Sequence, residues 1–473
     1  MLPYIHPDLA TAYNLMGMIH FEIDQLDDAM RYFEHALNLH EKSIPTDDPL
    51  IAADLHNMAR IDIKAHRFDM AFTRLKQSLQ IKLSVLPTDH PLISHAYVNM
   101  GLLYAEQKLW TDAHSFYDKA IAIQRKTLPT THPDLAVSYA NKARVFIEEK
   151  QFDRALELYE QALNIQLKNI PFCASHLAHT CESIGLTNIY IGRYTQAIRS
   201  FEKALQYQLD CHASWSQLCS LYNNMGTANY RNEDYQLALR EYQTALDLIP
   251  LTDHSSKRFS TLNNIATAHL TMENYSIALH FYEQLIDTLD NVDLPPSNSS
   301  LITIYQNIGL CYLAIENNDL AIEYFARVVS LTENPSILSK IHSYIGDAFT
   351  GKNEFTNGVE NYELALIYDS SNENFVIMIH NSIGAAQHLS GDIHRALSSY
   401  HQALNIQLAT PSSDRSQVAI TCGIIANAYW EAGDLIEAMN YYTKQLELVT
   451  DANVKRQIEE CIDTIRNCLE NNH

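Results

Sequence analysis

Glycine is scarce in this chain, with only 13 among 473 residues. Average usage is about 7%, and each glycine weakens a helix by roughly 1 kcal/mol relative to alanine. The scarcity therefore favours helical structure. Tryptophan is also rare, with 3 residues, whereas tyrosine is abundant, with 27. An excess of one aromatic type indicates a structural position that recurs along the sequence.

Long apolar runs and basic runs are both missing. No apolar stretch approaches the ~20 residues that a membrane-spanning helix needs, and the first eight residues lack the basic region and apolar core of a signal peptide. The formal net charge is −23, whereas nucleic-acid binding requires clustered Lys and Arg. We therefore expect neither membrane insertion nor a nucleic-acid partner. The acidic charge mildly favours partners with basic segments.

Cysteines at redox or standard metal-binding spacings are absent. The eight cysteines include no CxxC pair, and none precedes Cys173, which is typical of reduced thiols and predicts a cytoplasmic location. The segment Cys173, His176, His179 and Cys181 holds four potential zinc ligands within nine residues. Its spacing fits no standard zinc module. A core cysteine with groove histidine is the favoured alternative, so no metal is expected.

Catalytic motifs are missing as well. The chain contains no GxGxxG, GxxxxGKS/T, GxSxG or HExxH segment, the patterns that mark common nucleotide-binding, hydrolase and metalloprotease sites. The sequence therefore predicts no catalytic residue and no cofactor, and the chain is not expected to be an enzyme.

A small residue recurs at nearly constant spacing along the chain. A second small residue lies twelve positions before it, and a bulky residue, aromatic in ten of eleven cases, lies four positions after it. The recurring small residues, at steps of 37 to 43 and most often 42, are Ala29, Ala71, Ala113, Ala155, Ala197, Ala238, Ala278, Ala321, Gly358, Ala396 and Ala438. The earlier small residues are Gly17, Ala59, Gly101, Ala143, Gly185, Gly226, Ala266, Gly309, Gly346, Gly384 and Ala426. The bulky residues are Phe33, Leu75, Tyr117, Tyr159, Phe201, Tyr242, Tyr282, Phe325, Tyr362, Tyr400 and Tyr442.

This pattern predicts pairs of antiparallel helices. Two helices approach closely only where side chains are small, and residues four apart share one helix face, so the aromatic residue fills the space against the next pair. Prolines at positions 7, 49, 91 and 133, again 42 apart, mark the turns between pairs. Each pair leaves an apolar face that only a neighbouring pair covers, which predicts a solenoid.

With its two small residues and its second-helix aromatic in register, the sequence resembles the tetratricopeptide repeat family over nearly the whole chain. The standard unit of that family has 34 residues, and most units here have 42. The longer unit, the segments 223–226 and 263–266 with their Asn-Asn-hydrophobic-Gly/Ala pattern, and the His-Pro-Asp-Leu-Ala turns at 6–10 and 132–136 look like the kinesin light chain subtype. HEAT and armadillo repeats share the period but lack this register. The resemblance implies an all-α, right-handed α-solenoid of eleven helix-turn-helix repeats.

Three segments are expected along the chain. Residues 6–210 form five regular repeats, and residues 211–450 form six repeats with irregular linkers, including a flexible loop at 290–300. In residues 451–473, apolar side chains follow helical spacing; they are Val454, Ile458, Ile462, Ile465 and Leu469. This segment is predicted to form a C-terminal helix that caps the last repeat, with a short tail.

No such cap precedes the first repeat. Residues 2–10 reproduce the pattern of residues 128–136, Leu-Pro-x-x-His-Pro-Asp-Leu-Ala, and resemble the tail of a repeat whose body is absent. We therefore expect either a fragment of a longer protein or a first repeat with an uncovered face. The first case allows a regulatory or substrate-recruiting arm of a multidomain enzyme with its catalytic domain upstream. The second allows self-association through the uncapped repeat.

An asparagine ladder is the strongest candidate for a binding site. Two positions before the first small residue of a repeat lie Asn57, Asn99, Asn141, Asn224, Asn264 and Asn307. In the tetratricopeptide repeat family this position faces a concave groove. The resemblance implies that these amides hold the backbone of a bound peptide, since an amide both donates and accepts hydrogen bonds. The alternatives are that the amides tie neighbouring helices together or face water. Helix interiors disfavour asparagine slightly, so its recurrence favours peptide binding.

Basic residues beside the ladder would set specificity. Arg60 and Arg144 follow the small residue of repeats two and four directly, and Lys64 lies one turn after Arg60. Because Arg pairs with a carboxylate through two parallel hydrogen bonds, these residues would receive an acidic peptide, as in carboxylate-clamp members of the family. The full clamp set is not present in its usual order. Salt bridges between repeats are the equally favoured alternative.

The chain is therefore predicted to be a non-enzymatic scaffold or adaptor that binds peptide or helical segments of other proteins in a concave groove. The kinesin light chain resemblance implies cargo binding on a microtubule motor and a cytoskeletal association. This chain lacks the heptad coiled coil that attaches those proteins to the motor heavy chain. A self-assembling scaffold is a further alternative.

Overall fold

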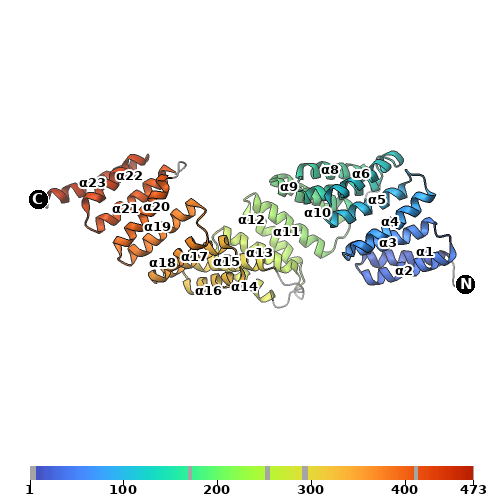
Figure 1. The fold of residues 1–473 in the computed structure, drawn as a ribbon, viewed down its shortest axis with the longest axis horizontal. Coiled ribbons are helices and arrows are strands. Elements are labelled where there is room, and N and C mark those ends of the chain that lie inside the picture. The colour runs from blue at the N-terminus through green and yellow to red at the C-terminus, as the bar shows by residue number, and fades with distance from the viewer. Residues whose placement is uncertain (1–6, 169–172, 251–255, 290–296, 410–413, 472–473) are drawn as a thin grey trace. The chain divides into compact units, whose positions relative to one another are not determined.

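The computed structural model describes residues 7–168, 173–250, 256–289, 297–409 and 414–471 (Figure 1). Helices joined by short turns account for these residues, and no strand occurs among them. The chain divides into two compact units, Met1–Ile249 (unit 1) and Pro250–His473 (unit 2).

Unit 1 contains twelve helices within its described residues. They are α1 (Pro7–Glu22), α2 (Leu26–Ser43), α3 (Pro49–Lys64), α4 (Phe68–Val85), α5 (Pro91–Glu106), α6 (Trp110–Thr127), α7 (Pro133–Glu148), α8 (Phe152–Lys168), α9 (Ala174–Ile191), α10 (Tyr194–Asp210), α11 (Trp215–Arg231) and α12 (Tyr235–Leu248).

The described part of unit 2 contains eleven helices. They are α13 (Ser256–Thr271), α14 (Tyr275–Leu289), α15 (Asn298–Ala314), α16 (Asn318–Leu331), α17 (Pro335–Gly351), α18 (Phe355–Tyr368), α19 (Glu373–Leu389), α20 (Ile393–Ala409), α21 (Arg415–Glu431), α22 (Leu435–Leu448) and α23 (Ala452–Asn471).

The helices of each unit pack in sequence order. The two helices of a pair, such as α3 and α4, contact each other, and within a unit each second helix contacts the first helix of the next pair. Eleven pairs, α1 to α22, and the additional helix α23 account for the helices of the described residues. The predicted all-α solenoid of eleven helix-turn-helix repeats is therefore confirmed.

The small and aromatic positions of the repeat meet where the two helices of a pair cross. At Gly185 an added Cβ would lie 2.4 Å from Cε1 of Phe201, so the phenyl ring occupies the space of the missing side chain. Phe201 also packs against Leu221 and Met225 of the next pair. The aromatic side chain thus joins its own pair and the following one, as the register predicted.

Polar caps begin the first helices of repeats two to four. The side chain of Asp48 accepts a hydrogen bond from the backbone N–H of Leu50 at 2.9 Å. Nδ1 of His90 and Nδ1 of His132 accept equivalent bonds at 3.2 Å. A proline follows each cap, where its missing N–H costs nothing. His6 occupies the same position in the first repeat and lies outside the described residues.

Second-helix length distinguishes the regular 42-residue repeats from most of the later repeats. The helices α2, α4, α6, α8 and α10 span 17 or 18 residues. The helices α12, α14, α16, α18 and α22 span 14 or 15, while α20 spans 17. The 42-residue unit therefore adds about one turn to the end of the second helix.

Helix α23 covers the last pair of unit 2. Ile458, Ile462 and Ile465 are buried in one cluster with Ala438 and Tyr442 of α22. The predicted C-terminal capping helix is confirmed.

Three segment-level expectations have different outcomes. Within the loop predicted at 290–300, residues 290–296 lie outside the described residues, and α15 already begins at Asn298. The division into 6–210, 211–450 and 451–473 was drawn from repeat regularity and stays a prediction, while the compact units divide after Ile249. None of the described helices is both long and apolar enough to cross a membrane.

Candidate functional site

The first helices of the pairs form the inner layer of each unit. In unit 1, α3 contacts α1 and α5, and α5 contacts α7; in unit 2, α15 contacts α13 and α17, and α17 contacts α19. No comparable contact joins successive second helices in the described parts of either unit. Because the first helices lie closer together, each stack curves toward them. Their exposed side chains form what we call the inner face.

The ladder asparagines lie on the first helices, and several of their amides bond to the preceding repeat. Nδ2 of Asn57 donates to Oδ1 of Asn14 at 3.2 Å. Nδ2 of Asn99 lies 3.0 Å from Nε2 of His56. These contacts join α3 to α1 and α5 to α3.

Two further ladder amides have a similar arrangement. Nδ2 of Asn224 donates to Oε1 of Glu182 at 2.9 Å, and Nδ2 of Asn307 donates to the hydroxyl of Tyr282 at 3.0 Å. Asn141 has no hydrogen-bond partner in the part of the chain that the structure describes. Four ladder amides therefore tie neighbouring repeats together, each through one of its two N–H groups.

The bond between Asn99 and His56 depends on a neutral imidazole. Removal from water, first of all, lowers the pKa of His56 well below its usual value of 6.5. Nearby positive charges lower it further; they belong to Lys82, Arg60 and His95. A neutral ring keeps one unprotonated nitrogen, which accepts a hydrogen bond from the amide.

The three predicted basic residues pair with carboxylates of the preceding repeat. The pairs are Arg60 with Glu22 at 4.0 Å, Lys64 with Asp24 at 2.6 Å and Arg144 with Glu106 at 3.2 Å. The Arg60 guanidinium also lies 4.4 Å from the ring centre of Phe21. All three cations therefore form the salt bridges between repeats that were the alternative to peptide binding.

Two hollows of the inner face are lined by residues that were predicted to bind a peptide. One, of about 320 Å³, lies between α5 and α7 and is lined by Ala105, Glu106, Lys108, Trp110, Arg144, Val145 and Glu148. The other, also of about 320 Å³, lies between α13 and α15 and is lined by Phe259, Ser260, Asn263, Asn264, Ser300, Thr303 and Ile304. Arg144 and Asn264 thus border different hollows, each in its own unit.

Within the second hollow, Oδ1 of Asn263 is buried and has no hydrogen-bond partner in the described structure. A buried acceptor without a partner costs about 1–3 kcal/mol. A ligand N–H would satisfy it. Asn263 directly precedes the ladder residue Asn264 on α13, so the two amides enter one hollow.

Tetratricopeptide repeat families match the chain at several places. The matched residues are 8–84, 92–168, 217–291, 178–211, 302–335 and 421–455, which cover more than half of the chain. The chain belongs to the tetratricopeptide repeat family. All six ladder asparagines and the three basic residues lie within matched repeats of this tetratricopeptide repeat chain.

Solved structures share the fold of this tetratricopeptide repeat chain at low sequence identity. The apo form of RapI is 16% identical with a TM-score of 0.58, and the match covers 76% of this chain and 97% of that chain. The apo form of the quorum sensor NprR from B. thuringiensis is also 16% identical, with a TM-score of 0.51 and the same coverage. A putative kinesin light chain with nearly identical TPR-like repeats from Podosopora anserina is 22% identical, with a TM-score of 0.36 over 44% of this chain and 99% of that chain. No curated protein matches the chain.

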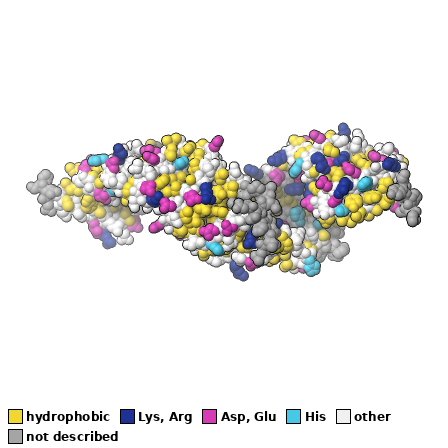
Figure 2. All heavy atoms as spheres, turned by 90° about the horizontal axis from the view of Figure 1, so that it is seen from below, with side chains coloured by type: hydrophobic (Ala, Val, Ile, Leu, Met, Phe, Trp, Pro, Cys, Tyr) yellow, Lys and Arg dark blue, Asp and Glu magenta, His cyan; other side chains and the backbone are white. Residues whose placement is uncertain are grey.

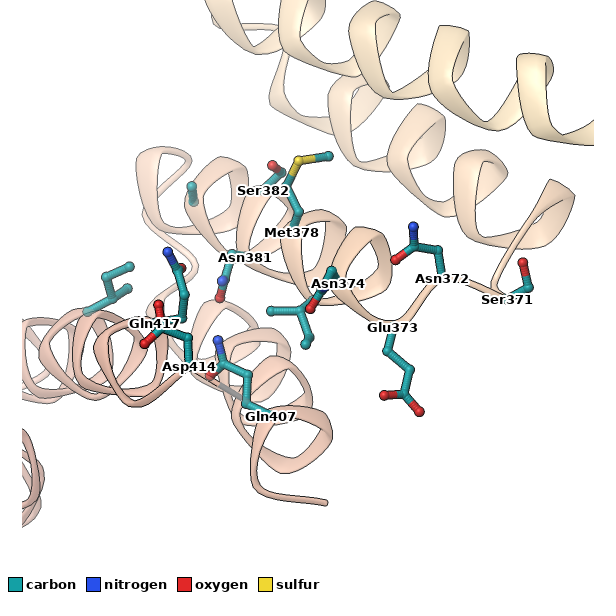
Figure 3. Close-up of a pocket in the computed structure, with 13 residues that line it drawn as sticks. Ser371, Asn372, Glu373, Asn374, Met378, Asn381, Ser382, Gln407, Asp414 and Gln417 are labelled. Atoms are coloured by element: carbon teal, nitrogen blue, oxygen red, sulfur yellow. The ribbon is translucent and has the colours of Figure 1, made fainter. Parts of the chain in front are cut away.

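A larger hollow of the tetratricopeptide repeat chain lies where no site was predicted. It measures about 1000 Å³, and most of its lining residues come from α19, α20 and α21 of unit 2 (Figure 3). Helices α19 and α21 do not pack together as α17 and α19 do. The second helix α20 lies between them in the sequence.

A sequence signal for this hollow exists one position away from the ladder. Asn381 lies three residues before Gly384, whereas the ladder asparagines lie two residues before the small residue. Asn14, Asn223 and Asn263 occupy the same earlier position in their repeats. A helix turns by 100° per residue, so the two positions point in different directions, and a pattern restricted to one of them misses the other.

The candidate zinc ligands do not form a metal site. Among the described residues, no group of three or more His, Cys, Asp or Glu side chains is placed to hold a metal ion. Cys173 is exposed at the N-cap of α9, and Cys181 is buried in the core of the next turns. Burial raises the pKa of the Cys181 thiol to about 11, which suits a core side chain rather than a thiolate ligand.

Proposed function

We propose that this chain is a non-enzymatic scaffold that binds peptide segments of partner proteins along the inner face of its repeats. The observation that carries the proposal is the unfilled hydrogen-bonding capacity of that face. The amide of Asn141 has no partner in the described chain, and Oδ1 of Asn263 is buried without one. Asn263 lines the hollow between α13 and α15, and Asn141 lies one helical turn before Arg144, which lines the hollow between α5 and α7.

The amide geometry suits a peptide backbone. An asparagine side chain presents one acceptor and two donors, the complement of the N–H and C=O that every non-proline residue offers. Contacts of this kind hold an extended chain without reading its side chains. The ladder would therefore supply affinity, and neighbouring charges would supply selectivity.

In unit 1 the basic residues favour an acidic peptide. Side chains of Lys64 and Arg144 are 47% and 49% exposed, and their carboxylate partners are exposed as well. Exposed ion pairs contribute only about 0–1 kcal/mol. A peptide carboxylate therefore replaces Asp24 or Glu106 at little cost, and it gains a charge-assisted hydrogen bond.

A pull-down from cytosol with quantitative mass spectrometry tests the proposal. The bait is the full chain, compared with the double variant Asn141→Ala/Arg144→Ala. A matched control is Asn38→Ala/Arg199→Ala, which changes the same residue types at exposed positions of the second helices α2 and α10. Circular dichroism of all three chains should agree.

We expect a set of partners to fall at least tenfold with the inner-face variant and to persist with the control. These partners should share acidic segments. Equal recovery by all three chains would exclude this part of the inner face as the working site. Recovery of a microtubule motor heavy chain within the lost set would extend the proposal to the cargo-binding role that the kinesin light chain resemblance implies.

We also propose that the chain self-associates through the exposed apolar side chains of helix α1. Met16 is 40% exposed, whereas Met58 at the same repeat position is 3% exposed. Ile19 is 56% exposed, whereas Ile61 and Leu103 at its position are 1% exposed. In the later repeats the preceding pair covers these positions.

Analytical ultracentrifugation of the full chain tests this association. We expect a concentration-dependent dimer that Ile19→Lys abolishes, with Ile436→Lys, an exposed apolar residue of α22, as the control. A monomer at all concentrations, or a dimer that Ile19→Lys does not affect, would exclude association through α1.

A further inference from the structure

Amides are the most frequent polar side chains in the lining of the hollow beside α19 and α21. Asn374 and Asn381 come from α19, Gln407 from α20 and Gln417 from α21. Figure 3 shows Asn381 and Gln417 extending into the space between α19 and α21. The apolar part of the wall comes from Ile377, Met378, Ala385 and Ile424. Such a wall offers both hydrogen bonds and an aliphatic contact.

One acceptor in this wall is already desolvated. Oδ1 of Asn381 is buried and has no hydrogen-bond partner among the described residues. Leaving a buried acceptor unsatisfied is unfavourable. An N–H group from a ligand in the hollow would restore the missing bond.

The charges at the rim have one sign. Glu373 and Asp414 line the hollow, and none of its lining residues is Lys or Arg. These carboxylates lie at the start of α19 and directly before α21, where each helix N-terminus contributes roughly half a positive charge. The full negative charge of Asp414 exceeds the partial charge of the helix terminus beside it, so the rim stays negative there.

The net charge of the whole of unit 2 has the same sign as the charge at the rim. Residues 1–249 contain 22 Lys and Arg against 29 Asp and Glu, and residues 250–473 contain 11 against 27. The formal net charges of the two units are therefore −7 and −16. Acidic and basic side chains of both units are visible on the face shown in Figure 2. A cationic ligand is thus favoured at unit 2 by the local rim and by the surrounding field.

We propose that the hollow lined by α19, α20 and α21 binds an extended peptide segment carrying a Lys or Arg next to an aliphatic residue. Oδ1 of Asn381 accepts a backbone N–H of the peptide. The carboxylate of Asp414 receives the cationic side chain. Met378 and Ile424 contact the aliphatic one. This site is separate from the asparagine ladder and prefers the opposite charge from the groove proposed for unit 1.

The dimensions of the hollow agree with a short peptide. Its wall along α19 runs from Glu373 to Ala385, a length of about 18 Å at 1.5 Å per residue. An extended chain covers about 3.3–3.6 Å per residue, so about five residues fit along it. A pocket of about 1000 Å³ is at the upper end of the range for small-molecule sites.

A peptide array tests the site with the full chain. The probes are hexapeptides, acetylated and amidated, in which the two central positions run through all pairs of the twenty amino acids between Gly-Ala and Ala-Gly. The wild-type chain is compared with Asn381→Ala and with Asn440→Ala. Asn440 is an exposed asparagine of α22 outside the hollow, so it controls for the loss of an amide from the same unit.

We expect peptides with Lys or Arg next to Leu, Ile or Met to bind the wild type and Asn440→Ala, and to bind Asn381→Ala at least tenfold more weakly. Identical binding by the three chains, or no binding by any, would overturn the proposal. So would an Asn381-dependent set that carries Asp or Glu. Each of these failures leaves the Asn141 and Arg144 pull-down unaffected, so the two proposals fail separately.

A second variant separates charge recognition from folding. Oδ1 of Asp414 accepts a hydrogen bond from the backbone N–H of Ser416 at 2.9 Å, and asparagine caps a helix as well as aspartate does. Asp414→Asn therefore keeps α21 and removes the charge. We expect the preference for a Lys peptide over its Gln analogue to fall about tenfold. An unchanged preference would show that the rim does not read charge, which contradicts the proposal.

Discussion

Units 1 and 2 follow one repeat plan but bury different polar groups. Among the described residues, all buried His, Asp and Lys side chains lie in unit 1. They are His40, Asp54, Asp62 and Lys82. The buried polar residues of unit 2 are hydroxyl side chains and one amide: Thr261, Thr288, Ser339, Ser343, Ser399, Gln407 and Thr421. Unit 1 is therefore held together partly by buried ionic contacts, whereas the ion pairs between repeats in the described part of unit 2, such as Lys352 with Asp319, are partly exposed.

The length of the second helix explains part of this difference. Eleven residues after the recurring small residue, the longer second helices bury a polar side chain: His40, Lys82, Gln124, Gln208 and, in unit 2, Gln407 of α20. In the shorter helices the same position is the C-cap, at Ile249, Thr332, Asp369 and Val449. The added turn thus places this position within the second helix instead of at its C-cap. This chain fills that position with a polar group.

Removing Asp62 should break the strongest ionic contact of unit 1. Asp62 is fully buried and bonds to Nε of Arg67 at 2.9 Å and to Arg74. Deleting one partner of a buried ion pair costs about 3–5 kcal/mol, because the other charge stays buried. Because the side chains of Arg67 and Arg74 are 43% and 16% exposed, we expect Asp62→Ala to destabilise unit 1 by less than that amount, about 2–3 kcal/mol, and to leave unit 2 unchanged. Urea titration followed by hydrogen exchange in each unit measures both, with exposed Asp69→Ala as the control.

A comparable loss of protection in both units would contradict the separation into two units. A loss of less than about 1 kcal/mol would show that the two arginines reach water when the aspartate is absent.

Replacing Lys82 should stabilise unit 1, whereas replacing Asp62 should destabilise it. Lys82 is 4% exposed, and its ammonium has no hydrogen bond or ion pair among the described residues. Burial lowers the pKa of Lys82 from 10.5 to about 8, and each pKa unit corresponds to about 1.4 kcal/mol. At pH 7 the amine is charged in both states, so burial destabilises the folded state. We expect Lys82→Met to stabilise unit 1 by about 2–3 kcal/mol.

Denaturant midpoints of Lys82→Met and of Lys76→Met, an exposed lysine of the same helix, provide the measurement. A gain shared by both variants would indicate a general charge effect. A loss of stability at position 82 alone would mean that the ammonium has a stabilising contact that the described structure does not contain.

Acid should destabilise unit 1 through His56. Its folded-state pKa lies well below 6.5, mainly because of burial. Between that pKa and 6.5 the unfolded chain binds the proton first, so stability falls as the pH decreases below about 6.5. The slope is up to about 1.4 kcal/mol per pH unit. We expect His56→Gln, which retains an acceptor for Asn99, to remove this component from unit 1 only.

Stability curves of each unit from pH 7.5 to 5 test the prediction for His56. Unit 2 is an internal control because burial also lowers the pKa of His269, His380 and His401 there. Its acid sensitivity should persist in His56→Gln. An unchanged slope for unit 1 would refute the assignment to His56.

The smallest effects should come from the exposed ion pairs of the inner face. Lys64→Ala and Arg144→Ala remove salt bridges whose members are about one-third or more exposed. Such pairs contribute about 0–1 kcal/mol, so we expect thermal stability to change little in either variant. A loss above about 2 kcal/mol would mean that these cations are structural, and it would weaken the case for their role in peptide binding.

The repeat register could be predicted in full because it depends on local volume. Gly185 and Phe201 are sixteen residues apart and belong to one pair, so sequence spacing alone places the ring over the glycine. The caps at His90 and His132 are equally local. The partners of Asn57 and Asn224 lie about one repeat earlier in the chain, at Asn14 and Glu182. Their contacts depend on how repeats stack, which the register does not specify side chain by side chain.

By itself, the sequence determined the helical solenoid, the number of repeats and the capping helix, because spacing and residue size act within a pair or between adjacent pairs. Only the tertiary structure decided which inner-face groups are already bonded and where the stack opens. The hollow beside α19 and α21 depends on the separation of two first helices that follow each other by a whole repeat. That separation depends on how a whole repeat packs, and no local pattern encodes a distance of this kind.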